Sequence, residues 1–336
     1  MPLGPRNLIT DVPGLRVGNA ADLKARSGVT VVLPDAPAAA AVDVRGGGPG
    51  TAETDLLDPA ATVPCVDALV LSGGSVFGLE ARAGVAGWLA AQGRGFAVAG
   101  VSVPIVPAAI LFDLTNGGDK DWGETPPYQA LGREAVISAD LDFALGTSGA
   151  GTGARAGMLK GGLGSASWIM PDGTTIGALV AVNSLGSAVE PESGAFWSWM
   201  LEQEGEFGSS RPPTKPLADL DDVAGEGSPV AGAHTTLAIV ATDARLDKVG
   251  CRRLAIMAQD GLARALRPVH SPLDGDTVFA LSTARRPEPD IHGLALLGRA
   301  AADCLARAVA RGVWAAERLD DQPSWRERYA SSRGNR

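Results

Sequence analysis

The pattern of hydrophobic and polar positions alternates between short β-rich runs and helical stripes along the chain. A continuous apolar run at 67–72 (DALVLS) predicts a buried strand. It leads through Gly73 and Gly74 into residues 76–92, where apolar side chains recur at helical spacing with small residues between them. A strand that runs directly into a helix is typical of layered α/β folds, so we expect an α/β protein.

The remaining segments repeat this organisation. Residues 1–45 combine short β-rich runs with turns. Further strands are expected within 95–112, at 165–170, at 174–184 and at 235–242, and helices at 127–137, 246–266 and 291–318. A Pro-Asp-Gly turn separates the strands at 165–170 and 174–184, which predicts a hairpin.

A connector interrupts this pattern before the last third of the chain. Residues 201–233 are rich in proline, glycine, serine and acidic residues, a composition typical of an exposed, mobile connector. Directly after it, Thr235 opens the β-branched run TTLAIVAT (235–242). The connector therefore ends where a strand is expected to begin.

Composition restricts the class of protein more than the fold. Of the 336 residues, 45% are hydrophobic and only 5% aromatic, so small and aliphatic side chains must fill the core. The net charge of −9 disfavours a nucleic-acid surface, which needs clustered basic residues. The N-terminus lacks the apolar segment of a signal peptide, and the most apolar stretch, 101–112, is short and contains two prolines. We expect a cytoplasmic protein without a membrane span.

Motifs for metals and cofactors are weak or missing. Cys65, Cys251 and Cys304 are far apart and odd in number, so they define neither a zinc site nor a disulfide framework. The sequence has no H-x-x-E-H or C-x-x-C motif. The stretch GAGTGA (149–154) matches the dinucleotide-binding fingerprint weakly, because more glycines follow it where a helix is needed. We expect no metal ion and no cofactor.

A serine-hydrolase site is an alternative that the motifs support only in part. Near misses of the nucleophile-elbow motif G-x-S-x-G lie at 73–78 and 146–150, and His270 with an aspartate would complete a Ser-His-Asp triad. Neither segment matches the motif, and the chain has only three histidines. In the simpler interpretation, His270 is an ordinary loop residue.

The junction before Thr235 offers a more specific chemistry. A hydroxyl residue at the start of a strand can attack the carbonyl of the residue before it, here His234, and the resulting ester then hydrolyses. The new N-terminal amine, with a pKa of about 8 in simple peptides, can accept the proton of the Thr235 hydroxyl. One residue would then supply both nucleophile and base. Taken alone, the position also fits a threonine that merely begins a strand.

Seven long stretches of unusual sequence lie along nearly the whole chain: ITDVPGLRVG (9–18), LVLSGGSVFGLEARAGVAGWL (69–89), VPIVPAAILFDL (103–114), GTGARAGMLKGGLGSAS (151–167), ALVAVNSLG (178–186), HTTLAIVATDA (234–244) and RPVHSPLDGDTVFALST (267–283). They resemble the family of L-aminopeptidases/D-esterases, β-peptidyl aminopeptidases and nylon-oligomer hydrolases, which are self-cleaving N-terminal nucleophile hydrolases. The resemblance implies one catalytic domain over 1–336, cut into an α chain (1–234) and a β chain (235–336). It also implies a layered αββα-type sandwich.

Carried over residue by residue, the resemblance implies a role for each of five residues. Thr235 matches the processed nucleophile, and Asn183 matches an asparagine suited to donate to an oxyanion at the scissile carbonyl. Asp274 and Asp276 match the acidic or polar pair that orients the nucleophile and its ammonium group. Lys160 matches a lysine of the nylon hydrolases beside the active centre, with a solvated loop lysine as an equal alternative.

Two positions depart from the pattern of many relatives. His234 stands before the nucleophile where those relatives have Asn or Gly, a change that can alter the rate of self-cleavage. Phe77 replaces a tyrosine that some relatives present to the substrate, so a hydroxyl donor is lost. With Gly73 and Gly74 nearby, Phe77 implies an apolar substrate pocket.

The resemblance implies hydrolysis of small peptides or amides with N-terminal L-, D- or β-amino acids, or of ω-amino-acid (nylon) oligomers. An acyltransferase of the ornithine acetyltransferase type shares the self-cleaving threonine, but the A-T-M-L context of those enzymes is absent. A non-catalytic scaffold of the same fold is the other alternative. Relatives form compact oligomers, so we expect a homotetramer of αβ units, with the apolar segment WSWM (197–200) at an interface.

Overall fold

Two five-stranded sheets form the framework of the protein in the computed structural model, which describes residues 1–212 and 234–330. The first sheet has the order β1 (Leu15–Asp22), β2 (Ser27–Pro34), β5 (Leu69–Ser72), β8 (Ala108–Ile110) and β4 (Gly50–Ala52). The second has the order β11 (Gly162–Ile169), β12 (Thr175–Asn183), β13 (Thr235–Ala244), β14 (Thr277–Arg286) and β3 (Ala39–Val44). Both sheets are mixed, because β5 pairs in parallel with β8, and β13 in parallel with β14.

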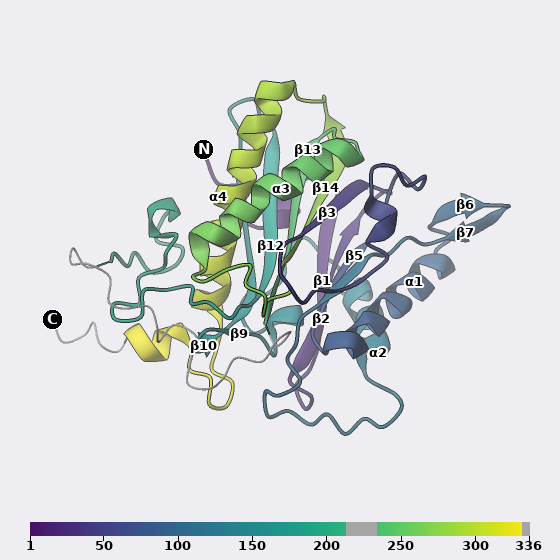
Figure 1. Ribbon diagram of the computed structural model, residues 1–336. Coiled ribbons are helices and arrows are strands. Elements are labelled where there is room, and N and C mark those ends of the chain that lie inside the picture. The colour runs from purple at the N-terminus through teal and green to yellow at the C-terminus, as the bar shows by residue number, and fades with distance from the viewer. Residues whose placement is uncertain (213–233, 331–336) are drawn as a thin grey trace.

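Helices cover the outer face of each sheet (Figure 1). The helices α1 (Ala81–Ala91) and α2 (Tyr128–Ile137) pack on the first sheet, and α3 (Lys248–Ala265) and α4 (Ile291–Ala315) pack on the second. A further cluster of buried side chains fills the space between the two sheets. The layer order is therefore helix, sheet, sheet, helix, which confirms the expected αββα-type sandwich.

Short elements complete the described chain. The strands β6 (Phe96–Val98) and β7 (Val101–Val103) form one two-stranded sheet, and β9 (Arg155–Ala156) and β10 (Leu159–Lys160) form another. Turns of 3₁₀ helix lie at Ile9–Asp11, Asp55–Leu57, Ser75–Glu80, Gly149–Gly151 and Trp199–Leu201, and a π-helical turn lies at Arg326–Ala330.

Small residues let the layers approach each other closely. A Cβ atom at Gly164 in β11 would stand only 1.9 Å from the carbonyl oxygen of Ala308 in α4, so no side chain fits there. Glycine is therefore required for the close approach of this helix to the sheet. Among the described residues buried between the sheets, Phe279 is the one aromatic side chain, in agreement with the low aromatic content.

Most expected elements are present, and two of them are divided. The segment 76–92 begins as the 3₁₀ turn Ser75–Glu80 and becomes regular only in α1. The apolar segment 95–112 is split into the β6–β7 hairpin and β8, because Pro104 and Pro107 lie between them and proline cannot donate to a strand ladder.

Further features of the sequence concern a nucleotide site, the connector, a metal site and a membrane span. The glycine-rich stretch 149–154 is a 3₁₀ turn that leads into β9, so it lacks the helix that a dinucleotide site requires. Residues 213–233 of the predicted connector lie outside the described residues. Within the described ranges, no group of three His, Cys, Asp or Glu side chains is placed to hold a metal ion. In the same ranges, no helix has the length and apolar character needed to cross a membrane.

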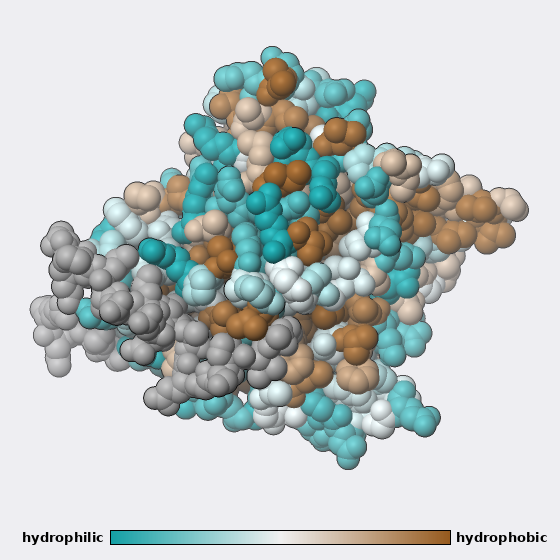
Figure 2. Space-filling view, in the orientation of Figure 1, coloured by the Kyte–Doolittle hydropathy of each residue, from teal (hydrophilic) through white to brown (hydrophobic). Residues whose placement is uncertain are grey.

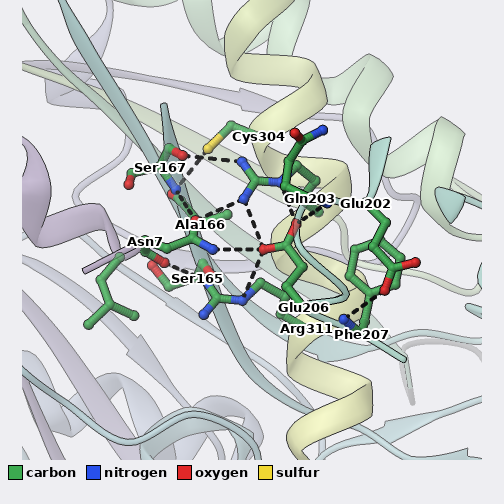
Figure 3. A network of polar contacts seen from close by, with 12 residues as sticks. Asn7, Ser165, Ala166, Ser167, Glu202, Gln203, Glu206, Phe207, Cys304 and Arg311 are labelled. Carbon is green, nitrogen blue, oxygen red and sulfur yellow. Dashed lines mark hydrogen bonds and ion pairs between the residues drawn. The ribbon is translucent and has the colours of Figure 1, made fainter. Parts of the chain in front are cut away.

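A buried ionic cluster ties Glu206, within the first part of the predicted connector 201–233, to α4 (Figure 3). The prediction of an exposed connector is wrong at this point, because the Glu206 side chain is only 7% exposed. Arg307 donates to Glu206 through Nε over 2.6 Å and through Nη2 over 2.9 Å, and Arg311 lies 3.4 Å from the same carboxylate. Asn7 donates to Glu206 over 2.7 Å and accepts from Arg307 over 2.9 Å. The Arg307 side chain is fully buried and lies over the Trp168 ring. The cluster therefore joins the N-terminal segment, residues near 206 and the C-terminal helix.

Candidate active site

The register of the second sheet brings distant site residues to one point. Thr235 is the first residue of β13 and is only 2% exposed. It lies opposite Asn183, which is the last residue of the neighbouring strand β12. The preceding residue, His234, is bridged in parallel to Asp274, just before β14. The start of β13 is therefore held between an asparagine and an aspartate from two different segments.

The carbonyl group of His234 receives two hydrogen bonds. The Thr235 hydroxyl donates to its oxygen over 2.5 Å, and the Gly275 backbone N–H donates over 2.8 Å. Donors on a carbonyl oxygen stabilise the oxyanion that forms when a nucleophile adds to the carbon. The peptide bond between His234 and Thr235 is thus polarised and in contact with a hydroxyl group.

Gly275 is a site residue that the sequence analysis did not identify. A Cβ atom at this position would lie 2.6 Å from Thr235 Oγ1 and 2.7 Å from the Gly48 carbonyl oxygen. Only glycine lets this backbone approach the Thr235 hydroxyl so closely. Its place between two aspartates in the triplet Asp-Gly-Asp was the available signal, since a glycine flanked by site residues often marks a close backbone approach.

Asp274 is buried and held by donors on both of its carboxylate oxygens. The Ser271 hydroxyl donates to Oδ2 over 2.5 Å, and the Leu185 N–H donates to Oδ1 over 3.2 Å. Burial and, next, the charge of Asp276 raise the pKa of the Asp274 carboxyl, while these hydrogen bonds oppose the rise. The Asp274 carboxylate is therefore fixed in place, on a residue whose backbone is bridged to His234.

Asp276 holds the residue that follows Thr235. Its Oδ1 accepts the Thr236 N–H over 2.8 Å, and its Oδ2 lies 2.9 Å from Nδ1 of His270. Sequence reasoning had left His270 as an ordinary loop residue, and no local signal separates it from one. The structure brings it to the site through a contact that closes only in the folded chain.

Asn183 has a fixed side-chain orientation. Its Oδ1 accepts the Arg155 N–H over 2.9 Å, and its Nδ2 donates to the Phe112 carbonyl over 3.1 Å. The side chain is 2% exposed. A buried amide held on both atoms has one fixed orientation.

Lys160 is a fully buried residue, so the alternative of a solvated loop lysine is wrong. Its Nζ donates to the carbonyls of Gly151, Ala154 and Gly161, each over 2.8 Å. Burial lowers the pKa of Lys160 to about 7, and Asp113 opposes that shift. Lys160 braces the backbone just before Arg155, whose N–H holds Asn183.

The Gly73-Gly74 turn is built around aromatic packing. Gly74 has φ +84°, and a Cβ atom there would lie 2.0 Å from the Tyr128 ring. The Gly74 N–H donates to the Asp113 carboxylate. Asp113 directly follows Phe112, and the Phe112 carbonyl accepts a hydrogen bond from Asn183 Nδ2. Phe77, on the following 3₁₀ turn, is 40% exposed and packs edge-on against the partly buried Trp122. Phe77 therefore offers an exposed apolar ring next to the Gly73-Gly74 turn.

Comparison with known proteins agrees with this geometry. The profile described as Peptidase family S58 matches residues 7–324. The chain belongs to peptidase family S58. This peptidase is therefore a hydrolase of peptide or amide bonds, and the resemblance noted in its sequence to the aminopeptidases and nylon-oligomer hydrolases is confirmed.

Relatives of this peptidase include enzymes named for different substrates. An uncharacterized aminopeptidase of Mycobacterium bovis is 46% identical over 349 residues, which cover 98% of this chain and 100% of the relative. The 6-aminohexanoate-oligomer endohydrolase of a Kocuria strain is 29% identical over 302 residues, which cover 86% of this chain and 79% of that enzyme.

Two solved structures share the fold of this peptidase. The β-aminopeptidase of a Burkholderia species superposes with a TM-score of 0.69 at 24% identity, covering 96% of this chain and 90% of the other. The L-aminopeptidase D-Ala-esterase/amidase of Ochrobactrum anthropi, described as a variant of the N-terminal nucleophile hydrolase fold, gives 0.68 at 22% identity, covering 98% and 96%. The architecture of the two mixed sheets is thus that of the N-terminal nucleophile hydrolases.

Proposed function

We propose that this peptidase cuts its own chain between His234 and Thr235 and then uses Thr235 as an N-terminal nucleophile. One observation carries the proposal. The Thr235 hydroxyl lies 2.5 Å from the carbonyl oxygen of the residue before it, and a second donor, the Gly275 N–H, lies on the same oxygen. Nucleophile, electrophile and oxyanion donor are together in the uncut chain.

Self-cleavage would proceed by transfer of an acyl group from nitrogen to oxygen. Thr235 Oγ1 adds to the carbonyl carbon of His234, and the bond from that carbon to the Thr235 nitrogen breaks. The hydroxyl proton ends on the released amine. Water then hydrolyses the ester, which leaves a carboxylate on His234 and a free amine on Thr235. The Gly275 N–H stabilises the oxyanion of the first step.

Turnover of a substrate would use the same nucleophile with its new amine as the base. The amine accepts the proton of the Thr235 hydroxyl, which attacks the substrate carbonyl. Asn183, opposite Thr235 in the neighbouring strand, would donate to the oxyanion in this proposal. Asp274 and Asp276 supply negative charge for the ammonium form, and Lys160 braces the backbone that holds Asn183.

The substrates that we propose are small peptides or amides. The relatives are named as aminopeptidases, a β-aminopeptidase and a 6-aminohexanoate-oligomer hydrolase, so N-terminal L-, D- or β-amino acids and ω-amino-acid oligomers are all within the proposed range. Phe77 presents an apolar ring, which favours apolar acyl groups. A panel of p-nitroanilides of L-, D- and β-amino acids together with amide oligomers would select among them.

The experiment that tests self-cleavage is the mass and N-terminal sequence of the purified protein. We expect fragments 1–234 and 235–336, the smaller with 336 − 235 + 1 = 102 residues. Edman sequencing of the smaller fragment should begin Thr-Thr-Leu-Ala-Ile. A purified, active protein that remains one chain of 336 residues would refute the proposal. Release of amine with water as the acceptor distinguishes the hydrolase from an acyltransferase.

We also propose that four αβ units form a homo-oligomer, with the β6–β7 hairpin at an interface. The hairpin projects from the body of the molecule, and hydrophobic residues gather on it (Figures 1 and 2). Phe96 pairs with Val103, and Val98 pairs with Val101, so four exposed apolar side chains share one face. A hairpin exposed on both faces is only marginally stable in water, so a second copy covering this face would stabilise it.

The segment 197–200 is a weaker candidate for that interface than expected. Trp197 and Trp199 pack under the guanidinium groups of Arg267 and Arg211, and only Met200 is largely exposed. The two tryptophans therefore already have partners within their own chain.

A further inference from the structure

His270 is tied to the candidate site by two hydrogen bonds to one oxygen. Its backbone N–H donates to Asp276 Oδ2 over 3.0 Å, and its ring Nδ1 lies 2.9 Å from the same atom. The residue has φ +54°, a left-handed conformation that is unfavourable for most side chains. The surrounding structure must hold this conformation, and such strain gathers at functional sites.

The carboxylate that His270 holds is itself attached to the start of β13. Asp276 is 1% exposed, and its other oxygen accepts the N–H of Thr236 over 2.8 Å. Thr236 is the residue directly after the nucleophile. A continuous chain of hydrogen bonds therefore runs from the His270 ring through one carboxylate to the backbone that carries Thr235.

The next residue along the chain holds the other carboxylate. Ser271 donates to Asp274 Oδ2 through its N–H over 3.2 Å and through its hydroxyl over 2.5 Å. One turn thus holds both acidic residues, Asp276 through His270 and Asp274 through Ser271. This arrangement is more than the capping of a loop, because the Asp276 carboxylate accepts the Thr236 N–H and the Asp274 backbone is bridged to His234.

We infer that His270 is a positioning residue for self-cleavage and turnover, because its ring fixes the Asp276 carboxylate that holds Thr236. The inference rests on the proposed role of Thr235 as nucleophile. His270 acts through Asp276 and not on the reacting atoms. In this role Nδ1 carries a hydrogen and donates to the carboxylate, in either charge state of the ring.

Loss of the ring would remove one of the two hydrogen bonds from His270 to Asp276 Oδ2 and leave the one from the backbone N–H. The carboxylate could then rotate and release the Thr236 N–H, and the Thr235 hydroxyl would lose its orientation. Small misplacements of a reacting group reduce rates strongly, by up to about 10²-fold for 1 Å. Because Asp276 holds the strand that carries the proposed nucleophile, the loss should appear in kcat more than in KM.

Two substitutions at one position separate the ring from the backbone. His270→Gly removes the ring and accepts the left-handed conformation without strain. His270→Asn also tolerates that conformation and offers an amide N–H close to the place of Nδ1. We expect His270→Gly to lower kcat and the rate of self-cleavage about 10- to 100-fold, the effect of one lost hydrogen bond to a charged group. His270→Asn should recover most of this loss.

Ala284→Gly is the matched control, since Ala284 is exposed and has φ +52°. It should cleave itself and turn over a p-nitroanilide like the wild type, and thermal unfolding should show that all three variants are folded. The inference is overturned if His270→Gly keeps kcat and self-cleavage within about twofold of wild type, or if His270→Asn is no better than His270→Gly. A wild-type protein that remains uncut would instead refute the proposed function itself.

Discussion

At the scale of single residues, the start of β13 concentrates the chemistry of this peptidase. The Thr235 hydroxyl and the Gly275 N–H both donate to the His234 carbonyl, and the Thr236 N–H donates to Asp276. The peptide bond is intrinsically stable, so the hydroxyl and the polarised carbonyl must both be present for it to break.

Substitution of the nucleophile tests this directly. Thr235→Ala should remain a single chain, because it lacks the proposed attacking hydroxyl. It should fold normally, because the substitution removes little apolar volume. Thr235→Ser should still cleave, more slowly, since it keeps the hydroxyl but loses the methyl group that restricts χ1. Gel electrophoresis, circular dichroism and amide hydrolysis would check these outcomes. Full activity in an uncut Thr235→Ala protein would return Thr235 to the role of a strand-opening residue.

Lys160 gives the stability of the chain a pH dependence of known sign. Its pKa is about 7 in the folded chain and near 10.5 when unfolded, so the unfolded chain binds more protons between these values. The free energy of unfolding should therefore rise as the pH rises from about 7 to about 10.5, because the cost of burying a charged Lys160 is lost over this range.

The comparison that isolates this effect is Lys160→Met against the parent chain. Both would carry Thr235→Ala, so that cleavage does not intervene, and urea unfolding would be followed across the same pH range. Other groups that titrate there are common to both proteins. The stability difference between the two chains should change with pH, and a constant difference would mean that Lys160 does not titrate in the window.

At the scale of elements, the two proposed fragments interleave. The strand β13 opens the smaller fragment, yet its antiparallel neighbour β12 belongs to the larger one, while β14 belongs to the smaller. The fully buried Arg307 on α4 and its partner Glu206 form a second link between the fragments. The ladder and the ion pair would both hold the fragments together after the cut.

Breaking that ion pair should cost far more than breaking one on the surface. Arg307→Met leaves the buried Glu206 carboxylate with Arg311, Asn7 and the Gln203 N–H as its described partners, and removing one partner of a buried pair typically costs about 3–5 kcal/mol. Urea unfolding of the uncut Thr235→Ala chain would measure the loss. Asp35→Asn, which breaks the exposed pair with Arg285, is the control and should cost less than about 1 kcal/mol.

At the scale of the whole molecule, the apolar face of the β6–β7 hairpin is the clearest surface for assembly. No charged residue lies between Arg94 and Asp113, so the hairpin offers nothing but shape and apolar area to a partner. Its base is anchored, since Arg94 donates to the Pro34 carbonyl and Asp67 accepts the Ile105 N–H. The hairpin thus projects from an anchored base and is suited to pack against a second copy of the chain.

Charge placed on this face should dissociate the assembly. Val101 is 63% exposed, and Val101→Asp would desolvate a carboxylate at the proposed interface. Light scattering should give a mass near 34.2 kDa for this variant and a multiple of it for the wild type. Ser102→Asp places the same charge on the opposite face of the hairpin and should leave the mass unchanged. A wild-type mass of one unit at micromolar concentration would contradict the proposal.

The sequence by itself determined the local structure and the outline of the chemistry. Periodicity identified the strands at 67–72 and 174–184 and the helices at 127–137, 246–266 and 291–318, because side-chain spacing follows directly from helix and strand geometry. The abrupt change from a proline-rich connector to a β-branched strand pointed to Thr235.

Only the tertiary structure decided which distant groups surround the start of β13. Sequence left Lys160 open between a place beside the active centre and a solvated loop, passed over Gly275 and treated His270 as a loop residue. Gly275 and His270 reach Thr235 and Thr236 through the register of β13 between β12 and β14, and Lys160 is buried by carbonyls of the 151–161 segment. A hydrogen bond such as that from His270 to Asp276 has no periodicity of its own, so it becomes visible only when the fold closes the turn that contains both residues.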